Sequence, residues 1–157
     1  MKAQKTVREL LLEQLEGNQA HVDFDQAVQG VSYKQTGIKV EGVPHTIWEL
    51  IDHIRIAQAD ILEFCRNPDY KELDWPNDYW PEHSSPPDKE TFEQSIRAIR
   101  DGIEEMKALI RDSKNNLRKP LPHGDGQTLF REAMLIVDHN AYHIGQIVQI
   151  RRMMGIW

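Results

Sequence analysis

Three long runs of apolar residues recur at intervals of three and four, and this spacing limits the fold more than any other feature of the sequence. It places the apolar side chains along one face of an α-helix, whereas a half-buried strand needs strict alternation. The runs are Ile47, Leu50, Ile51, Ile54, Ile61 and Cys65; then Ile96, Ile99, Ile103, Met106 and Ile110; and last Leu129, Ala133, Ile136, Ile147, Ile150 and Met154. A shorter run of Val7, Leu10, Leu11 and Leu15 predicts another helix over residues 5–17. Four helices that each bury one face predict an all-α four-helix bundle with long connections, formed by residues 1–157 as one domain.

Capping and breaking residues set the expected ends of the three long helices. A threonine followed three residues later by a glutamate forms a capping box, and serine or threonine before an apolar run is a typical helix start. Proline opens a helix or prevents its continuation, and glycine commonly ends one. The expected helices run from Thr46 to about Arg66, from Ser85 to about Asp112, and from Thr128 to Met154, before Gly155.

The connections differ in character. Residues 21–31 are expected to form a short helical piece, and residues 32–44 a connection in which Gly37, Gly42 and Pro44 are the breaking residues. Residues 67–87 contain five prolines, which forbid a continuous helix, and four aromatic residues. A loop of this length and composition either packs down onto the bundle or lines a site, and the sequence leaves both interpretations open.

Composition excludes several classes of partner. The formal net charge is −6, and no basic stripe is present that would match the phosphates of a nucleic acid. No apolar run approaches the length of a membrane span. Charged residues interrupt the apolar residues at the start of the sequence, whereas a signal peptide needs an unbroken apolar stretch. We therefore expect no nucleic acid, no membrane and a cytoplasmic location. The single cysteine, Cys65, cannot form an internal disulfide and is expected in the core.

Two histidines, His139 and His143, lie four residues apart in the last expected helix. At 100° per residue His143 falls within the apolar stripe and His139 at its edge, so both imidazoles point toward the bundle interior, about 6 Å apart along the axis. Neutral imidazole is a common metal ligand, but interior histidines are often simply hydrogen-bonded. The metalloprotease motif H-E-x-x-H has glutamate where this chain has Asn140, so that signature is excluded.

A third ligand would have to come from another helix, and His53 is the candidate. It lies on the flank of the stripe in the helix that follows Thr46, where it can face the last helix. His45 is about 12 Å from His53 along a helix and is better explained as a turn residue. The remaining histidines, expected in surface loops, are His21, His83 and His123.

The segments VPHTIWELIDHIRIAQADILEF and LIVDHNAYHIGQIVQIRRMMG, with VRELLLEQLEGNQAHVDF near the start, resemble the DinB-like superfamily of bacterial proteins. The resemblance implies a four-helix bundle and a divalent metal held by His53, His139 and His143, with zinc or nickel as the expected ion. It further implies an external low-molecular-weight thiol such as bacillithiol, mycothiol or glutathione, and a homodimer. Relatives include thiol-dependent transferases and proteins labelled as metal-dependent hydrolases, so either activity, or a non-catalytic stress-related metal protein, fits the pattern.

Three protein ligands leave a metal position open, as in catalytic rather than structural zinc sites. Near His53, the carboxylates of Glu49 and Asp60 either orient an imidazole, act as a base or lie on a solvated face. Tyr142 is expected to point away from the site. Candidates for the dimer surface, because they lie off the main stripes, are Trp48, Ile56, Val137 and Val148.

Overall fold

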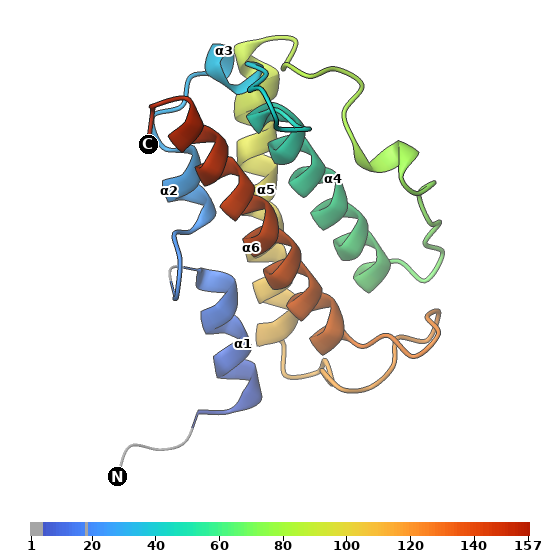
Figure 1. Cartoon of the computed structure of the whole chain (residues 1–157). Coiled ribbons are helices and arrows are strands. Elements are labelled where there is room, and N and C mark those ends of the chain that lie inside the picture. Colours follow the sequence, from blue (N-terminus) through green and yellow to red (C-terminus); the bar gives the residue numbers. More distant parts are fainter. Residues whose placement is uncertain (1–4, 18) are drawn as a thin grey trace.

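The computed structural model describes residues 5–17 and 19–157, so residues 1–4 and 18 of the expected domain lie outside the described part. Over the described part all regular secondary structure is helical, no strand is present, and the only β-type contact is an isolated bridge between Pro120 and Thr128. The helices are α1 (Val7–Glu16), α2 (Phe24–Val28), α3 (Tyr33–Thr36), α4 (Ile47–Arg66), the 3-10 turn η1 (Asn77–Tyr79), α5 (Lys89–Arg111) and α6 (Leu129–Met153) (Figure 1). The all-α bundle predicted from the apolar spacing is confirmed.

The three long helices form most of the bundle, with α4 packed against both α5 and α6. Thr46 and Glu49 cap α4 as the sequence predicts, and Thr128 caps α6 through its side chain. The predicted start at Ser85 is wrong, because the side chain of Asp88 makes the cap of α5 and residues before it are not helical. The two prolines between these residues precede the helix instead of forming its first turn.

The fourth side of the bundle consists of two short helices, α1 and α2, in place of one long helix. Helix α1 packs on α5 and α6, and α2 packs farther along α6 (Figure 1). Gly17, with a φ of 73°, ends α1, and the chain then bends before Asp23 caps α2. The fourth side is therefore interrupted halfway along the bundle.

The core is divided in the same way. One hydrophobic cluster joins α2 to the first half of α4, the first half of α5 and the second half of α6. The other joins α1 to the remaining halves of those three helices. Between the clusters the buried amide of Gln58, in α4, donates to the carbonyl oxygen of Ile99 at 2.7 Å. The middle of the bundle is thus partly polar.

The connection over residues 32–44 contains one helical turn, α3, because Ser32 and Gln35 form a capping box of their own. One expectation about the periphery needs correction. Trp48 and Val148 are buried within the chain, so neither can supply a dimer surface. None of the described helices combines the length and apolarity needed to cross a bilayer.

Candidate metal centre

His53, His139 and His143 converge between α4 and α6. One ligand nitrogen of each lies within 4.8 Å of those of the other two. The Nε2 atoms of His53 and His139 are 3.0 Å apart, and the ring centroids of His139 and His143 are separated by 4.5 Å. His53 and His143 are buried, with 2% and 6% of their surfaces exposed, whereas His139 is partly exposed. The arrangement is a group of three neutral donors that reaches solvent on the α6 side.

The second ring nitrogen of two of these histidines has a defined partner. His53 Nδ1 lies 2.7 Å from the carbonyl oxygen of Tyr79, which can only accept, so Nδ1 carries the proton. His143 Nδ1 lies 2.7 Å from Oε1 of Gln146, one helical turn later. Such contacts fix the tautomer and the ring orientation of a metal-ligating histidine. For both residues, the other nitrogen, Nε2, keeps its lone pair.

Asn140, next to His139, belongs to a buried chain of amides. Its Nδ2 donates to Oε1 of Gln58 at 3.0 Å, and Gln58 in turn donates to Ile99. The amide of Gln58 fits only because residue 102 is glycine, since a Cβ atom there would overlap Gln58 Nε2. Asn140 Oδ1 is buried and has no hydrogen-bond partner among the described residues. A buried acceptor therefore lies beside the one imidazole whose Nδ1 has no assigned partner.

Burial keeps the three imidazoles neutral. It lowers the pKa of His53 and of His143, in each case against the opposing effect of the hydrogen bond at Nδ1. For His139 burial is again the largest cause, followed by the charges that His143 and His53 would carry, and together they lower the pKa to about 4. Three neutral rings at physiological pH are ready to donate lone pairs without first losing protons.

An aromatic stack covers the site. The indole of Trp80 lies parallel to the His53 ring, with centroids 3.9 Å apart, and its other neighbour is His45, stacked at 4.1 Å. His45 is thus outside the group of three and contacts Trp80 instead. Tyr142, 66% exposed, packs its ring edgewise on His143 at 4.9 Å, so the expectation that it points away from the site is wrong.

The loop of residues 67–87 both packs on the bundle and lines the site. Asp60 of α4 accepts hydrogen bonds from the hydroxyl groups of Tyr70 and Tyr79, at 2.9 and 2.6 Å. Burial and then the bond to Asp60 raise the pKa of both phenols, to about 12 for Tyr70. Farther on, Thr46 Oγ1 donates to the carbonyl oxygen of Ser84 at 2.7 Å. These bonds hold the loop so that Tyr79 and Trp80 contact His53.

A comparison with protein families decides where the chain belongs. The family model described as the DinB superfamily matches residues 7–147, which include all three histidines. The chain belongs to the DinB superfamily. No curated protein and no solved structure shows significant similarity to it.

Other residues considered from the sequence of this DinB-superfamily protein have structural roles. Glu49 accepts from the backbone of Thr46, and Asp60 binds the two tyrosines, so neither carboxylate contacts an imidazole. Cys65 is only partly buried, and burial raises its thiol pKa to about 12. The surface assignment holds for His21 and His83 but not for His123, which is partly buried and hydrogen-bonded to the carbonyl oxygen of Phe64 at 2.6 Å.

Sequence reasoning missed several residues that shape the DinB-superfamily site. Gln146 follows His143 by three residues, and Gln58 continues the apolar stripe of α4 four residues after Ile54, so helical spacing contains a signal for both. Trp80 and the carbonyl group of Tyr79 come from the loop of residues 67–87, for which the sequence left open a role in lining a site, but their contacts with His53 were not predicted. No periodicity relates a loop residue to a helix face, so these two contacts could not be read from spacing.

Proposed function

We propose that this protein binds a divalent metal ion through His53, His139 and His143, with zinc or nickel as the expected ion. The observation that carries the proposal is the convergence of three neutral imidazoles from two helices, two of them oriented by acceptors at Nδ1. Ligands at about 2.0–2.1 Å from a tetrahedral zinc lie about 3.3 Å apart, so the group needs adjustments of an ångström or so to close on an ion.

The surrounding residues are suited to hold the ligands in place. The Tyr79 carbonyl oxygen and Gln146 hold His53 and His143 with Nε2 turned toward the site. We assign the same task for His139 to Oδ1 of Asn140, the buried acceptor without a partner. The amide chain through Gln58 to Ile99 would keep that oxygen from rotating away.

We further propose that the site activates an external thiol, or else a water, for attack on a small electrophile. An ion held by three neutral ligands keeps its double charge and so favours a thiolate or hydroxide at its open position. The chain offers no thiol of its own, because Cys65 has a raised pKa of about 12 and is not part of the histidine group. In the transfer, the thiol proton passes to solvent, a carbon–sulfur bond forms, and the leaving group departs with its electron pair.

The partial exposure of His139 supports a catalytic site over a sealed one, because a substrate needs a path to the ion. Tyr142 provides exposed aromatic surface beside His143, and Trp75, exposed on the same loop as Trp80, packs on the ring of Tyr79. Aromatic and apolar side chains line most small-molecule sites.

The test combines activity with spectroscopy. Metal-loaded protein is incubated with glutathione or bacillithiol and a panel of electrophiles, beside the variants His139→Ala and His143→Ala and the control His45→Ala. We expect turnover only in wild type and the control, and a thiolate-to-cobalt charge-transfer band in the cobalt-substituted forms of both. If cobalt binds but neither thiol ligation nor hydrolysis of ester and amide substrates is detected, the protein is a non-catalytic metal-binding protein.

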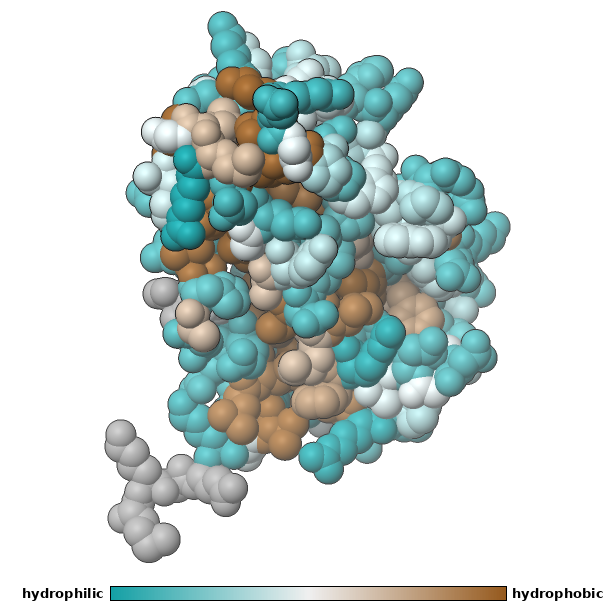
Figure 2. All heavy atoms as spheres, viewed as in Figure 1, coloured by the Kyte–Doolittle hydropathy of each residue, from teal (hydrophilic) through white to brown (hydrophobic). Residues whose placement is uncertain are grey.

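We also propose that the chain forms a homodimer through the face around α1. Val7 and Leu10 of α1 and Met134 of α6 are exposed hydrophobic residues, and Figure 2 shows hydrophobic side chains gathered over this end of the molecule. Apolar patches of this kind commonly mark interfaces. Light scattering should give twice the chain mass of 18.3 kDa, and Leu10→Glu should halve it. A monomeric mass for wild type at micromolar concentration would contradict the proposal.

A further inference from the structure

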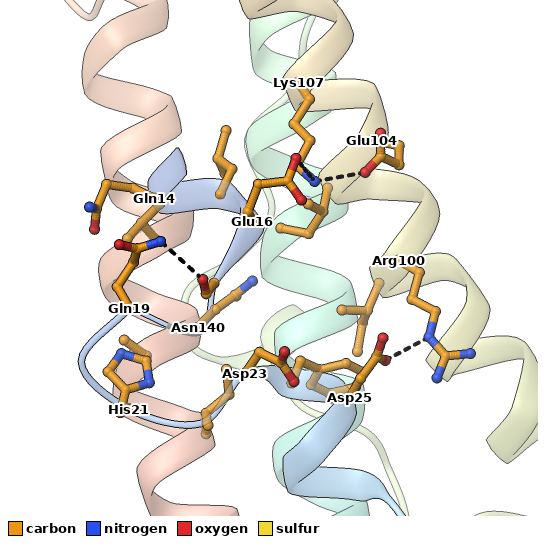
Figure 3. A pocket seen from close by; sticks show the side chains of 18 residues that line it. Gln14, Glu16, Gln19, His21, Asp23, Asp25, Arg100, Glu104, Lys107 and Asn140 are labelled. Carbon is orange, nitrogen blue, oxygen red and sulfur yellow. Dashed lines mark hydrogen bonds and ion pairs between the residues drawn. The ribbon is translucent and has the colours of Figure 1, made fainter. Parts of the chain in front are cut away.

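A cavity of about 380 Å³ opens on the side of α6 that faces away from the three histidines. Its walls come from the end of α1, the segment that joins α1 to α2, the middle of α5 and the middle of α6 (Figure 3). At 100° per residue, Ala141 lies opposite the mean direction of His139 and His143, and Val137 and Ile144, which also line the cavity, lie about 140° and 120° from that direction. The cavity is therefore separate from the candidate metal centre.

The broken fourth side of the bundle explains why the cavity exists. A single long helix in place of α1 and α2 would fill the groove between α5 and α6 along its whole length. Instead, the chain leaves the groove at Gly17 and returns at Asp23. The gap coincides with the boundary between the two hydrophobic clusters, because Leu15 and Ile103 belong to one and Ile144 to the other.

The cavity combines an apolar wall with an acidic mouth. Its apolar surface includes the side chains of Leu15, Phe24, Ile103, Val137 and Ile144. Its ionisable groups, apart from His21, are four carboxylates and two cations: Glu16, Asp23, Asp25 and Glu104 against Arg100 and Lys107, a net charge of −2. A volume within the range of small-molecule sites and an apolar wall favour an organic ligand, and the charge favours a cation.

Both cations are already engaged by carboxylates. Lys107 is 4% exposed, and its ammonium lies 3.0 Å from Glu16 and 2.8 Å from Glu104 (Figure 3). Arg100 pairs with Asp25 at 2.7 Å. Asp23 has no basic partner among the described residues, since its Oδ1 accepts only the backbone N–H of Gln26. An anionic ligand would have to displace an existing ion pair, whereas a cation can approach Asp23 directly.

We propose that this cavity binds a small organic monocation with an apolar body, an alkyl- or arylammonium compound. The hydrocarbon part occupies the wall between α1, α5 and α6, where it is removed from water. The ammonium group remains at the mouth, near Asp23 and the excess of carboxylates. None of the three histidines lines this cavity, so the proposal does not depend on metal binding at them.

The probe is 2-phenylethylammonium, compared with its neutral analogue 2-phenylethanol and the anion 3-phenylpropanoate. Binding to the metal-free protein is followed by calorimetry and by chemical-shift changes. We expect saturable binding of the cation, at least about tenfold weaker binding of the alcohol, and none of the anion up to about 10 mM. The same affinity should be measured for His143→Ala, which separates this site from the metal proposal.

Three variants locate the site. Ala141→Phe should abolish binding by filling the cavity from α6, while circular dichroism reports whether the fold is retained. Asp23→Asn keeps an N-cap residue for α2 and should weaken binding about fivefold by removing one charge of the mouth. Asp69→Asn, the same change outside the cavity, should have no effect. The proposal is overturned if the cation does not bind, if the alcohol binds equally well, or if Asp23→Asn and folded Ala141→Phe both bind as wild type does.

Discussion

The two sides of α6 use polar groups in opposite ways. Toward α4, His139 and His143 direct neutral nitrogens inward, and burial lowers their pKa values. Toward α1 and α5, the wall is apolar and the ionised groups gather at the mouth of the cavity. A neutral polar group with an oriented partner can be buried at modest cost, whereas a charge is costly to bury unless it is paired. The histidine side is therefore suited to ligate an ion, and the cavity side to admit an apolar body.

The two sides meet at Asn140 and Gln58. Asn140 lines the cavity, is the neighbour of His139 in sequence, and hydrogen-bonds to Gln58 in α4. The middle of the bundle is thus shared by both sites. Substitutions on one side of α6, at the shared amides or outside both sites can therefore show which residues support metal binding and which support the stability of the fold.

The largest effect is expected on metal content. His143→Ala removes a proposed ligand, and its metal affinity should fall by more than about 100-fold, because even the loss of an outer-sphere contact costs 10–100-fold. His45→Ala removes an imidazole that contacts Trp80 but lies outside the group of three, so it should retain the metal. Elemental analysis of both proteins after dialysis measures this. Equal metal content in the two variants would exclude His143 as a ligand.

A second effect should reach both sides through the shared amides. In Gly102→Ala the new methyl group overlaps Gln58 Nε2, so the amide must shift and its bonds to Ile99 and Asn140 weaken. We expect a loss of about 1–3 kcal/mol in the free energy of unfolding, together with weaker metal binding.

Gly145→Ala is the matched control for this substitution. It is also in a helix, but no atom lies within 4 Å of the added Cβ, so the unfolding free energy should rise by up to about 1 kcal/mol. Urea denaturation of the three proteins gives both values. If Gly102→Ala were as stable as Gly145→Ala, the amide chain would not be rigid.

Acid should destabilise the histidine side selectively. Histidines of the unfolded chain bind protons near pH 6.5, but the three histidines of the folded chain bind them only at lower pH, because burial lowers their pKa values. Stability of the metal-free protein should therefore fall as the pH drops below about 6.5, and for His139 the loss is complete near pH 4, its folded pKa.

The measurement is the unfolding free energy between pH 4 and 7.5, compared with a variant in which all three histidines are glutamine. Subtracting one unfolding free energy from the other at each pH cancels the contribution of the carboxylates, which the two proteins share. A constant difference over this range would show that the histidines titrate equally in the folded and unfolded states.

The smallest effect is expected for Tyr142→Ala. Tyr142 packs edgewise on His143 but is 66% exposed, so its loss should change metal affinity by less than about threefold. Ammonium binding should not change, although Ala141, the adjacent residue, lines the cavity. A large effect on metal binding would mean that Tyr142 positions His143.

Helical periodicity predicted the histidine side well and the cavity side poorly. His53, His139 and His143 lie on long helices, where spacing determines which residues share a face. The cap of α5 is Asp88 and not the predicted Ser85. Both are capping residues that flank the same two prolines, so the sequence does not distinguish between them. The cavity depends on how far the chain departs from the groove after Gly17, which is a property of tertiary packing and has no periodic signature.

The parallel contact between Trp80 and His53 has a practical consequence for following this protein in solution. Because the two rings are stacked with centroids 3.9 Å apart, we expect the emission of Trp80 to change when the His53 imidazole gains a proton or when a metal ion binds beside it. The other tryptophans, Trp48, Trp75 and Trp157, form no ring stack with any of the three histidines. The difference in emission between wild type and Trp80→Phe thus isolates one chromophore at the site. Trp80 would therefore serve as an intrinsic reporter, with which uptake of the proposed ion can be timed without a label.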